Sequence, residues 1–294
     1  MNQYARENGL LPSRVYQRVY CELFCGLLAE AQAHGVIPMY LLKGGMALEL
    51  RFGIRARASK DVDVGIISGA DDLLAVFERV LVVGFAGFTF RLRDNIRHLE
   101  NAVTYRLRVQ ILYAGRAFGT LDVDLNEADH ESASDVVTTG VLTGLGLPGP
   151  LSVPVLDSHL QIAHKLHGAT EPSRPDYENL RYRDVIDVLT FSRDKDLQIN
   201  FQWLREVVIA EFARRKHHRT WPPIFELPQR WREPIQNEAK ANDFPINDAD
   251  ELSREFVAFI AKIEGIDLED SIRRKDVDRP SIAPNHMPSS ELIE

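Results

Sequence analysis

Cysteines and long apolar runs are both scarce in this chain of 294 residues. The two cysteines, Cys21 and Cys25, lie four residues apart, a spacing that suits packing on one helix and matches no zinc-ligand pattern or disulfide framework. No stretch approaches the roughly 18 consecutive apolar residues of a membrane-spanning helix, and the N-terminus lacks an apolar signal core. These absences argue against disulfide-stabilised, zinc-binding and membrane proteins and predict a cytoplasmic location.

Positive charge is in the minority. The net charge of −8 argues against binding nucleic acid over the whole surface. Arginines nevertheless gather at residues 51–57, at 91–116 and in "RRKHHR" at 214–219. Two interpretations remain open: a local basic surface on an acidic protein, or solvated arginines spread over several faces.

The order of the predicted elements favours an α+β fold. Helical spacing of apolar residues predicts a first helix that begins at Ser13 and ends at Gly35. The segments "VIPMYLL", "DVDVGII", "FTFRLRD", "AVTYRLRVQILY" and "GTLDVDLNE" run apolar or alternate as strands do, and "MALELRF" and residues 71–83 have helical patterns. We therefore expect a mixed sheet flanked by helices in the N-terminal part.

A loop rich in glycine and proline, residues 143–154, offers the best internal boundary. Beyond it, apolar periodicity predicts a mainly helical region, with helices at 157–170, 182–193, 201–215 and 248–264. We expect an α/β domain over residues 1–145, a helical domain over 146–275 that completes the site, and a disordered proline-rich tail over 276–294.

The most informative stretch is "LLKGGMALELRFGIRARASKDVDVGI", residues 41–66. Gly44 and Gly45 stand between a predicted strand and a predicted helix, where backbone N–H groups and the positive helix end attract phosphate. Lys43 adds a point charge. A plain turn would explain the two glycines if they stood alone.

Two aspartates supply the stronger half of this motif. Asp61 and Asp63 lie two apart on a strand and so face the same side, where they repel each other unless a cation lies between them. Mg²⁺ prefers such oxygen ligands and shares its shell with substrate phosphates. A third carboxylate would complete two-metal chemistry, and we choose Asp124 over Asp122 because it lies deeper in its strand. A polar edge strand is the alternative.

The helical half contributes Lys165, Asp184 and Asp187. Lys165 lies off the buried face of its helix, so its ammonium either points into a cleft or snorkels at the surface. Asp184 and Asp187 are three apart and lie on one side of their helix. Either Arg183 pairs with Asp187 at i,i+4, or Asp187 orients Lys165 towards a phosphate.

Taken in order, these motifs resemble the AbiEii/MenT family of nucleotidyltransferase toxins, in the DNA polymerase β-type superfamily. The resemblance rests on "LLKGGMALELRFG", "RASKDVDVG", "QIAHKLHG" and "RYRDVIDVL" and covers residues 41–189. It implies a nucleotidyltransferase-type N-terminal domain and a toxin of a toxin–antitoxin pair. Such a toxin uses Mg²⁺, with Mn²⁺ as a second candidate, to add nucleotides from an NTP to the 3′ acceptor end of tRNA, which blocks translation. CTP or another pyrimidine nucleotide is the implied substrate, and tRNA (or another RNA 3′ end) and a cognate antitoxin are the implied partners.

Roles follow from the resemblance and the residue pattern together. The metal ligands are Asp61, Asp63 and Asp124, and Lys165 and Asp187 join them as catalytic residues. The nucleotide-binding residues are Lys43, Gly44, Gly45, Arg57, Ser59, Lys60 and Asp184. Ser59 is also a candidate for inhibitory phosphorylation, because a phosphate there would put negative charge where the triphosphate binds.

The sequence departs from the family pattern at two places. Met46 stands where many relatives carry a hydroxyl residue after the glycines, and Arg183 stands where a lysine often precedes the first aspartate of the later motif. His164 and His167 flank Lys165 without a third ligand at zinc spacing, and we interpret them as structural.

Two other functions are compatible with these motifs. A small-molecule nucleotidyltransferase of the antibiotic-modifying kind would need an acidic pocket for a cationic substrate, whereas RNA needs a stripe of basic residues. The arginines at 51–57 and 91–116 favour RNA. A non-catalytic module that binds a partner protein would lack some of the metal ligands, and this sequence has them all.

Overall fold

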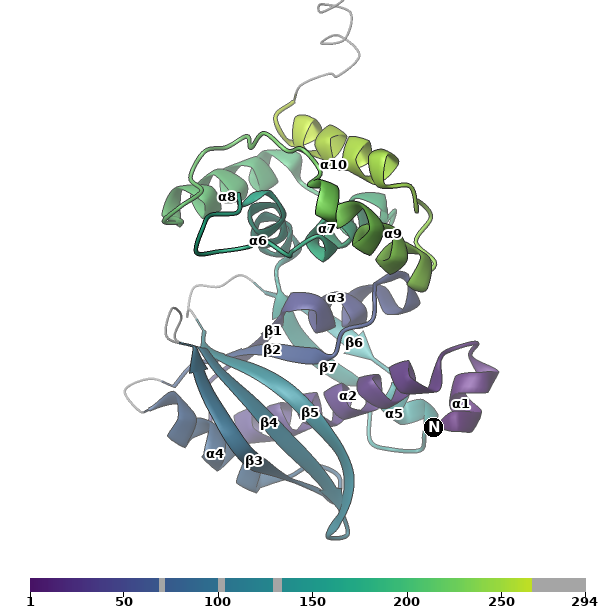
Figure 1. Ribbon diagram of the computed structural model, residues 1–294. Coiled ribbons are helices and arrows are strands. Elements are labelled where there is room, and N and C mark those ends of the chain that lie inside the picture. The colour runs from purple at the N-terminus through teal and green to yellow at the C-terminus, as the bar shows by residue number, and fades with distance from the viewer. Residues whose placement is uncertain (69–71, 100–103, 129–133, 266–294) are drawn as a thin grey trace, which may run out of the picture.

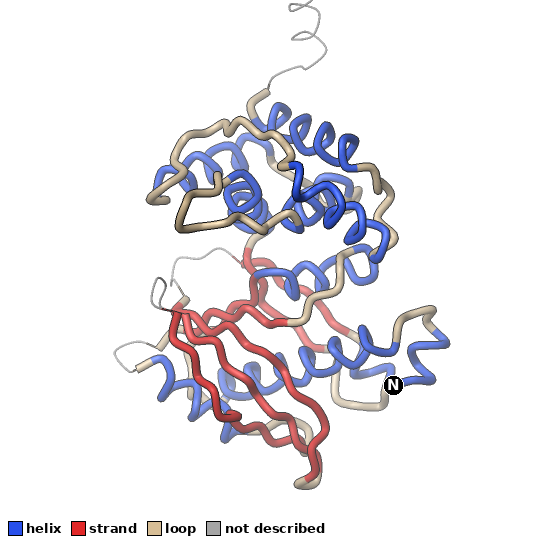
Figure 2. Tube along the Cα trace, in the orientation of Figure 1, coloured by secondary structure: helices blue, strands red, loops and turns tan. Residues whose placement is uncertain are grey.

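A computed structural model describes residues 1–68, 72–99, 104–128 and 134–265 (Figure 1). It has a sheet with helices in the N-terminal half and helices alone in the C-terminal half, which confirms the predicted α+β class (Figure 2). The tail predicted to be disordered, residues 276–294, lies outside the described residues. No helix within the described ranges is long and apolar enough to cross a membrane.

The sheet has seven strands in the order β3-β4-β5-β2-β1-β7-β6. It is mixed, because β2 pairs parallel with β5 and β1 pairs parallel with β7, while the other neighbours are antiparallel. The strands are β1 (Tyr40–Lys43), β2 (Asp61–Ile66), β3 (Phe88–Leu99), β4 (Thr104–Tyr113), β5 (Arg116–Glu127), β6 (Ser134–Thr139) and β7 (Leu151–Leu156).

Helices α2 (Pro12–Ala33) and α4 (Leu73–Val83) pack on the sheet and share its apolar core. The short α1 (Asn2–Glu7) and α5 (Val141–Gly144) contact α2. The prediction that Ser13 caps α2 is wrong. The helix begins at Pro12, because proline has no N–H to leave unpaired and its fixed φ suits the first turn.

The C-terminal half has its own apolar core, in which Trp231 is fully buried. All four predicted helices are present, and α9, which carries a mostly polar sequence, was not predicted. The helices are α6 (Ser158–Thr170), α7 (Arg183–Arg193), α8 (Phe201–Arg214), α9 (Arg232–Ala241) and α10 (Ala249–Ile263), with a short 3₁₀ turn at Gln229–Trp231.

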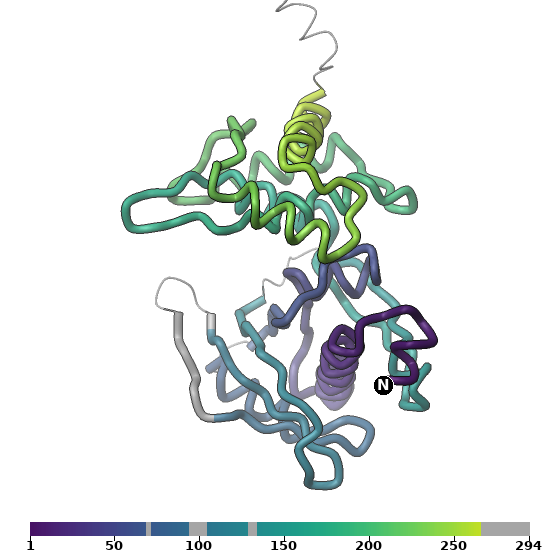
Figure 3. Tube along the Cα trace, turned by 45° about the vertical axis from the view of Figure 1, so that its right-hand side comes forward, coloured from purple at the N-terminus to yellow at the C-terminus, as the bar shows by residue number. Residues whose placement is uncertain are grey.

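Helix α3 (Gly44–Phe52) lies between the two halves in both views (Figures 1 and 3). Met46 and Leu50 belong to the core of the sheet, whereas Leu48 and Phe52 belong to the core of the helical half. Phe52 meets Phe191 of α7 edge to face, with ring centroids 5.0 Å apart. Because α3 is buried on both sides, its N-terminus is held rigidly where the halves meet.

The loop predicted at 143–154 is wrong in its second part. Leu151–Leu156 is strand β7, which pairs with β6 and places Val155 beside Leu42 of β1. The strand was missed because it is short, follows several glycines and contains Pro154. The sheet therefore continues past residue 145, and we propose that the two halves divide at Asp157, the N-cap of α6.

Candidate functional site

The junction of β1 and α3 brings two glycines against the side chains of the neighbouring strand. Gly44 has a φ of +68°, and a Cβ on it would lie 3.1 Å from Asp63 Cβ. A Cβ on Gly45 would lie only 2.8 Å from Ser59 Oγ. Lys43 is the N-cap of α3 and places its Nζ 3.7 Å from Asp63 Oδ1. The first turn of α3 thus lies directly over the first predicted metal-ligand strand.

Four carboxylates share one face of the sheet. The parallel pairing of β2 with β5 sets Asp61 beside Asp122 and Asp63 beside Asp124, and residues two apart on a strand face the same side. Burial raises the pKa of Asp63; Lys43 lowers it in part, and Asp124 and Asp61 raise it further. This crowding of negative charge is what a bound cation would relieve.

Two side chains that the sequence analysis missed hold these carboxylates. Arg106 of β4 binds Asp124 with both arms, Nε to Oδ1 at 2.8 Å and Nη2 to Oδ2 at 2.7 Å. Asn126 of β5 donates its Nδ2 to Asp63 Oδ1 at 3.0 Å. The alternation of β4 and β5 was the available signal, because it places both residues on the face that carries the aspartates.

Asp61, Asp63 and Asp124 border one cavity of about 250 Å³, which we call the carboxylate cavity. Asp122 lies outside its lining and is half-exposed, with 46% of its side chain accessible. The placement agrees with the choice of Asp124 over Asp122, although its role stays a prediction. The lining is Gly44, Gly45, Arg57, Ser59, Asp61, Asp63, Asp124, Lys165, Leu180, Arg181, Arg183 and Asp184.

Lys165 is buried and reaches this cavity from the helical half. Its Nζ lies 2.8 Å from Asp184 Oδ1 and 2.8 Å from Asp187 Oδ2, and only 6% of the residue is exposed, so the snorkelling alternative is wrong. Burial lowers the pKa of Lys165, but Asp184 and Asp187 together raise it by more, and the net shift is upward. Arg181 Nε binds the other oxygen of Asp184 at 2.5 Å.

Asp187 also binds a cation from the sheet half. Arg57 donates its Nε to Asp187 Oδ1 at 2.9 Å and its Nη2 to Asp187 Oδ2 at 3.1 Å. Arg183 pairs instead with Glu238 at 2.7 Å, so the i,i+4 alternative for Asp187 is wrong. The carboxylate of Asp187 therefore orients Lys165 and Arg57 together.

Ser59 and Lys60 lie differently from each other. Ser59 is buried, with its Oγ 3.3 Å from Asp61 O and its backbone N–H bound to Glu49 Oε2 at 2.9 Å. Lys60 is exposed and outside the lining of the carboxylate cavity. The structure brings Ser59 to the predicted site and leaves Lys60 at its margin.

A second cavity, of about 370 Å³, lies on the other side of Lys165, and we call it the α6 cavity. It shares Gly44, Asp63, Lys165 and Arg181 with the carboxylate cavity. The rest of its lining is Lys43, Leu156, Gln161, His164, His167, Gly168, Glu171, Arg214 and Arg215.

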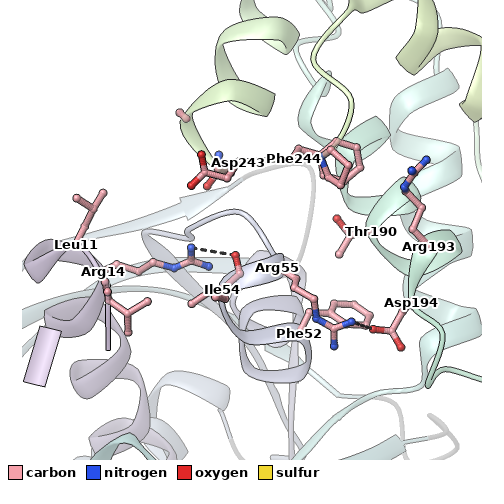
Figure 4. A pocket seen from close by; sticks show the side chains of 15 residues that line it. Leu11, Arg14, Phe52, Ile54, Arg55, Thr190, Arg193, Asp194, Asp243 and Phe244 are labelled. Atoms are coloured by element: carbon pink, nitrogen blue, oxygen red, sulfur yellow. Dashed lines mark hydrogen bonds and ion pairs between the residues drawn. The ribbon is translucent and has the colours of Figure 1, made fainter. Parts of the chain in front are cut away.

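A third cavity, of about 430 Å³, contains none of the predicted site residues. It lies where the start of α2 and the end of α3 face α7 and the loop after α9, between Leu11, Ile54 and Phe244 (Figure 4). Arg14 donates to the backbone oxygen of Ile54 in its wall at 3.4 Å. Its volume alone does not make it the site, because the charged groups that suit phosphate chemistry gather around Lys165.

Arginines of both clusters that favoured an RNA surface pair with carboxylates. Arg91 of the second cluster instead donates its Nε to Gln110 Oε1 at 2.8 Å, so these pairs reduce the argument for RNA that rested on charge and do not remove it. The pairs are Arg51 with Asp135, Arg55 with Asp194, Arg57 with Asp187, Arg106 with Asp124, and Arg108 with Asp122.

The donor set suits a magnesium ion shared with a substrate. Across the part of the chain that the structure describes, no three His, Cys, Asp or Glu side chains converge as a complete protein site would require. Mg²⁺ is commonly held by one or two carboxylates together with substrate phosphates. Asp61 and Asp63, on one strand face beside the N-terminus of α3, fit that requirement.

A family model described as "Nucleotidyl transferase AbiEii toxin, Type IV TA system" matches residues 26–277. The chain belongs to this family. It is thus a nucleotidyltransferase toxin of the type IV toxin–antitoxin class, and membership implies an NTP substrate and an antitoxin partner. The match includes every predicted site residue, from Lys43 to Asp187.

Solved structures that resemble the chain include a bacterial toxin and a fungal protein. MenT4, a nucleotidyltransferase toxin from Mycobacterium tuberculosis H37Rv, is 17% identical with a TM-score of 0.47, over 85% of this chain and 94% of that one. An antigenic nucleotidyltransferase-like protein from Paracoccidioides brasiliensis is 14% identical with a TM-score of 0.39, over 57% of this chain and 74% of that one. No curated protein sequence matches the chain.

Replacing Gly45 by alanine should lower nucleotidyl transfer at least about tenfold without unfolding the protein. The new Cβ would lie 2.8 Å from Ser59 Oγ and 3.0 Å from Arg57 Nη2, so the residues that flank the site must shift; even small misplacements at such sites slow reactions by one to two orders of magnitude. Gly140→Ala, where a Cβ meets nothing within 4 Å, is the matched control. Equal activity of the two variants would refute the tight fit.

The stability of the protein should fall as the pH drops from about 6.5 to about 4. Burial, with a further contribution from Arg215, lowers the pKa of His167 to about 4, whereas an unfolded histidine titrates near pH 6.5. Between these values the unfolded chain binds a proton at this histidine and the folded chain does not. The stability that depends on neutral His167 is therefore complete above pH 6.5 and is lost as the pH falls towards 4.

Urea unfolding at pH 7.5 and pH 4.5 would measure this loss. His167 should contribute roughly 1–3 kcal/mol of it, and His167→Gln should make the free energy of unfolding correspondingly less dependent on pH. An unaltered pH dependence in that variant would show that His167 is not buried in its neutral form.

Proposed function

We propose that this toxin transfers a nucleoside monophosphate from an NTP to the 3′-terminal hydroxyl of an RNA, with the acceptor end of tRNA as the first candidate. The observation that supports it is the meeting, at one cavity, of the α3 N-terminus, the Asp61–Asp63 strand face and the Lys165–Asp187 pair. Each supplies one requirement of phosphoryl chemistry: phosphate binding, metal ligands and a positioned cation.

The chain's own groups divide the work. The triphosphate would accept hydrogen bonds from the N–H groups of the first turn of α3, at Gly44 and Gly45. Asp61 and Asp63 would hold Mg²⁺, which supplies charge neutralisation on the phosphate oxygens. Lys165, held by Asp187 at 2.8 Å, would offset the negative charge that develops on the departing pyrophosphate.

In the reaction itself, the 3′ oxygen of the acceptor forms a bond to the α-phosphorus, and the bond from that phosphorus to the bridging oxygen of pyrophosphate breaks. The hydroxyl proton must pass to a base. Asp124 is our candidate for that role or for a third metal ligand. Arg106 donates one hydrogen bond to each of its oxygens, which leaves a lone pair on each for the proton or the metal ion.

The reaction type has more support than the identity of the RNA acceptor or of the nucleobase in the NTP. With five arginines of the predicted basic surface engaged by carboxylates, the proposal of tRNA and of a pyrimidine NTP depends on the family resemblance. A small-molecule acceptor is the competing proposal. Incubation with total RNA, or with a panel of small hydroxyl compounds, and each labelled NTP would distinguish them by where the label goes.

Substituting either metal-binding aspartate should abolish transfer. Asp61→Asn and Asp63→Asn keep the side-chain size and remove the charge that would hold the cation, so we expect rates at least about a hundredfold lower. Asp122→Asn is the matched control, because it lies on the same sheet face and outside the carboxylate cavity. The rate of label transfer from NTP measures all three. If Asp63→Asn retained the activity of the control variant, the proposed metal site would be wrong.

Ser59→Glu tests the proposed control by phosphorylation. A carboxylate at this position would lie beside Asp61 and under Gly45, where it would both crowd the first turn of α3 and repel the triphosphate. We expect NTP binding at least about tenfold weaker than in the wild type, and a much smaller loss in Ser59→Ala, which removes the hydroxyl without adding charge. Normal binding by Ser59→Glu would show that charge at this position does not regulate NTP binding.

A further inference from the structure

Gln161 lies in the wall of the α6 cavity, one helical turn before Lys165. The residue is 2% exposed. Neither its Oε1 nor its Nε2 has a hydrogen-bond partner in the described part of the chain. Buried polar atoms are nearly always paired, because an unpaired one loses its hydration without compensation. A carboxamide left with both a free donor and a free acceptor therefore points to a missing partner.

The geometry of the cavity indicates where that partner comes from. The α6 cavity is bordered by Gly44, Asp63 and Lys165, which it shares with the carboxylate cavity, and also by Gln161 and by residues at the end of α8. Gln161 and Lys165 stand on the same side of α6, about 6 Å apart along its axis. A molecule whose phosphate lies at Gly44 and Lys165 would extend its other end along this face to Gln161.

The chemistry of the lining favours a nucleobase over a phosphate as the ligand beside Gln161. A phosphate has acceptors and would leave Gln161 Oε1 unpaired. The cations nearest α8 are already engaged, since Arg214 and Arg215 both pair with Glu211. A nucleobase edge presents a donor beside an acceptor and satisfies both atoms of a carboxamide, as glutamine does with adenine in DNA recognition. The apolar side chain of Leu156 supplies part of a surface for the ring.

We propose that the α6 cavity holds the base of the incoming NTP and that Gln161 determines which base is accepted. The inference rests on the proposed function and extends it to substrate selection. The carboxamide is buried in the cavity wall, and a change of rotamer would bring it to the base edge. Its interactions are then made only when a base with the matching donor and acceptor arrives.

The test measures the binding of ATP, GTP, CTP, UTP and inorganic tripolyphosphate by calorimetry, with Mg²⁺. The variant is Gln161→Leu, which keeps a side chain of comparable size and removes both polar atoms. Gln17→Leu is the matched control, because Gln17 also has an unpaired buried oxygen and lies on α2, outside the lining of both cavities. We expect the wild type and the control to bind one NTP at least about tenfold more tightly than the weakest, as polar recognition sites do.

In Gln161→Leu this preference should shrink to about twofold, with tripolyphosphate binding unchanged and a melting temperature equal to or above that of the wild type, because an unpaired buried group has been removed. As a second variant, Gln161→Glu offers acceptors alone and should shift the preference towards GTP, whose base edge has neighbouring donors. This second variant decides the matter if the leucine variant does not fold.

Three results would overturn the proposal: equal binding of all four NTPs by the wild type, an unchanged preference in both Gln161 variants, or an equal loss for every NTP and for tripolyphosphate. The last would make Gln161 a structural or phosphate-binding residue. Failure of the proposed function looks different. In that case the wild type transfers label from no NTP to any acceptor, while the base preference in binding still depends on Gln161.

Discussion

The carboxylate of Asp187 binds one cation from each half of the protein, Arg57 before β2 and Lys165 of α6. Only 1% of its side chain is exposed, and the two cations are mostly buried as well. Removing one partner from such a buried cluster leaves an uncompensated charge and costs about 3–5 kcal/mol. The cluster is therefore stable only when the sheet half and the helical half are closed on each other, and closure fixes Lys165 opposite Asp63.

The packing of α3 fixes the position of the two halves relative to each other closely enough for catalysis. Leu48 and Phe52 enter the core of the helical half, while Met46 and Leu50 enter that of the sheet. A helix buried on both sides cannot rotate without opening a void in one core, and closely packed interiors resist this. The N-terminus of α3, the strand face of Asp63 and the ammonium of Lys165 are thus placed by apolar packing, and the ion pairs orient what the packing has brought together.

Sequence periodicity predicted most of what is local in this site. The alternation of β2 places Asp61 and Asp63 on one face, and the two glycines lie where β1 passes into α3, as the first two residues of the helix. Contacts that depend on long-range register could not be read in this way. The pairing of Asp63 with Asp124 requires the parallel register of β2 and β5, and Arg106 joins them only through β4. A free arginine and a paired one look alike in a sequence, so the carboxylate partners of these arginines could not be predicted.

Gly44 and Gly45 meet two separate requirements of the site. The sequence suggests that Gly44 and Gly45 clear a path for phosphate, and the structure shows that each also avoids a collision, with Asp63 and Ser59 respectively. A Gly-Gly pair would be needed here even in a protein that binds no nucleotide, so it is weak evidence by itself. The two requirements nevertheless share a cause. Phosphates bound at the N–H groups of α3 can share a metal ion with Asp61 and Asp63 only if the helix lies close to β2. At that distance there is no room for a Cβ on the two glycines.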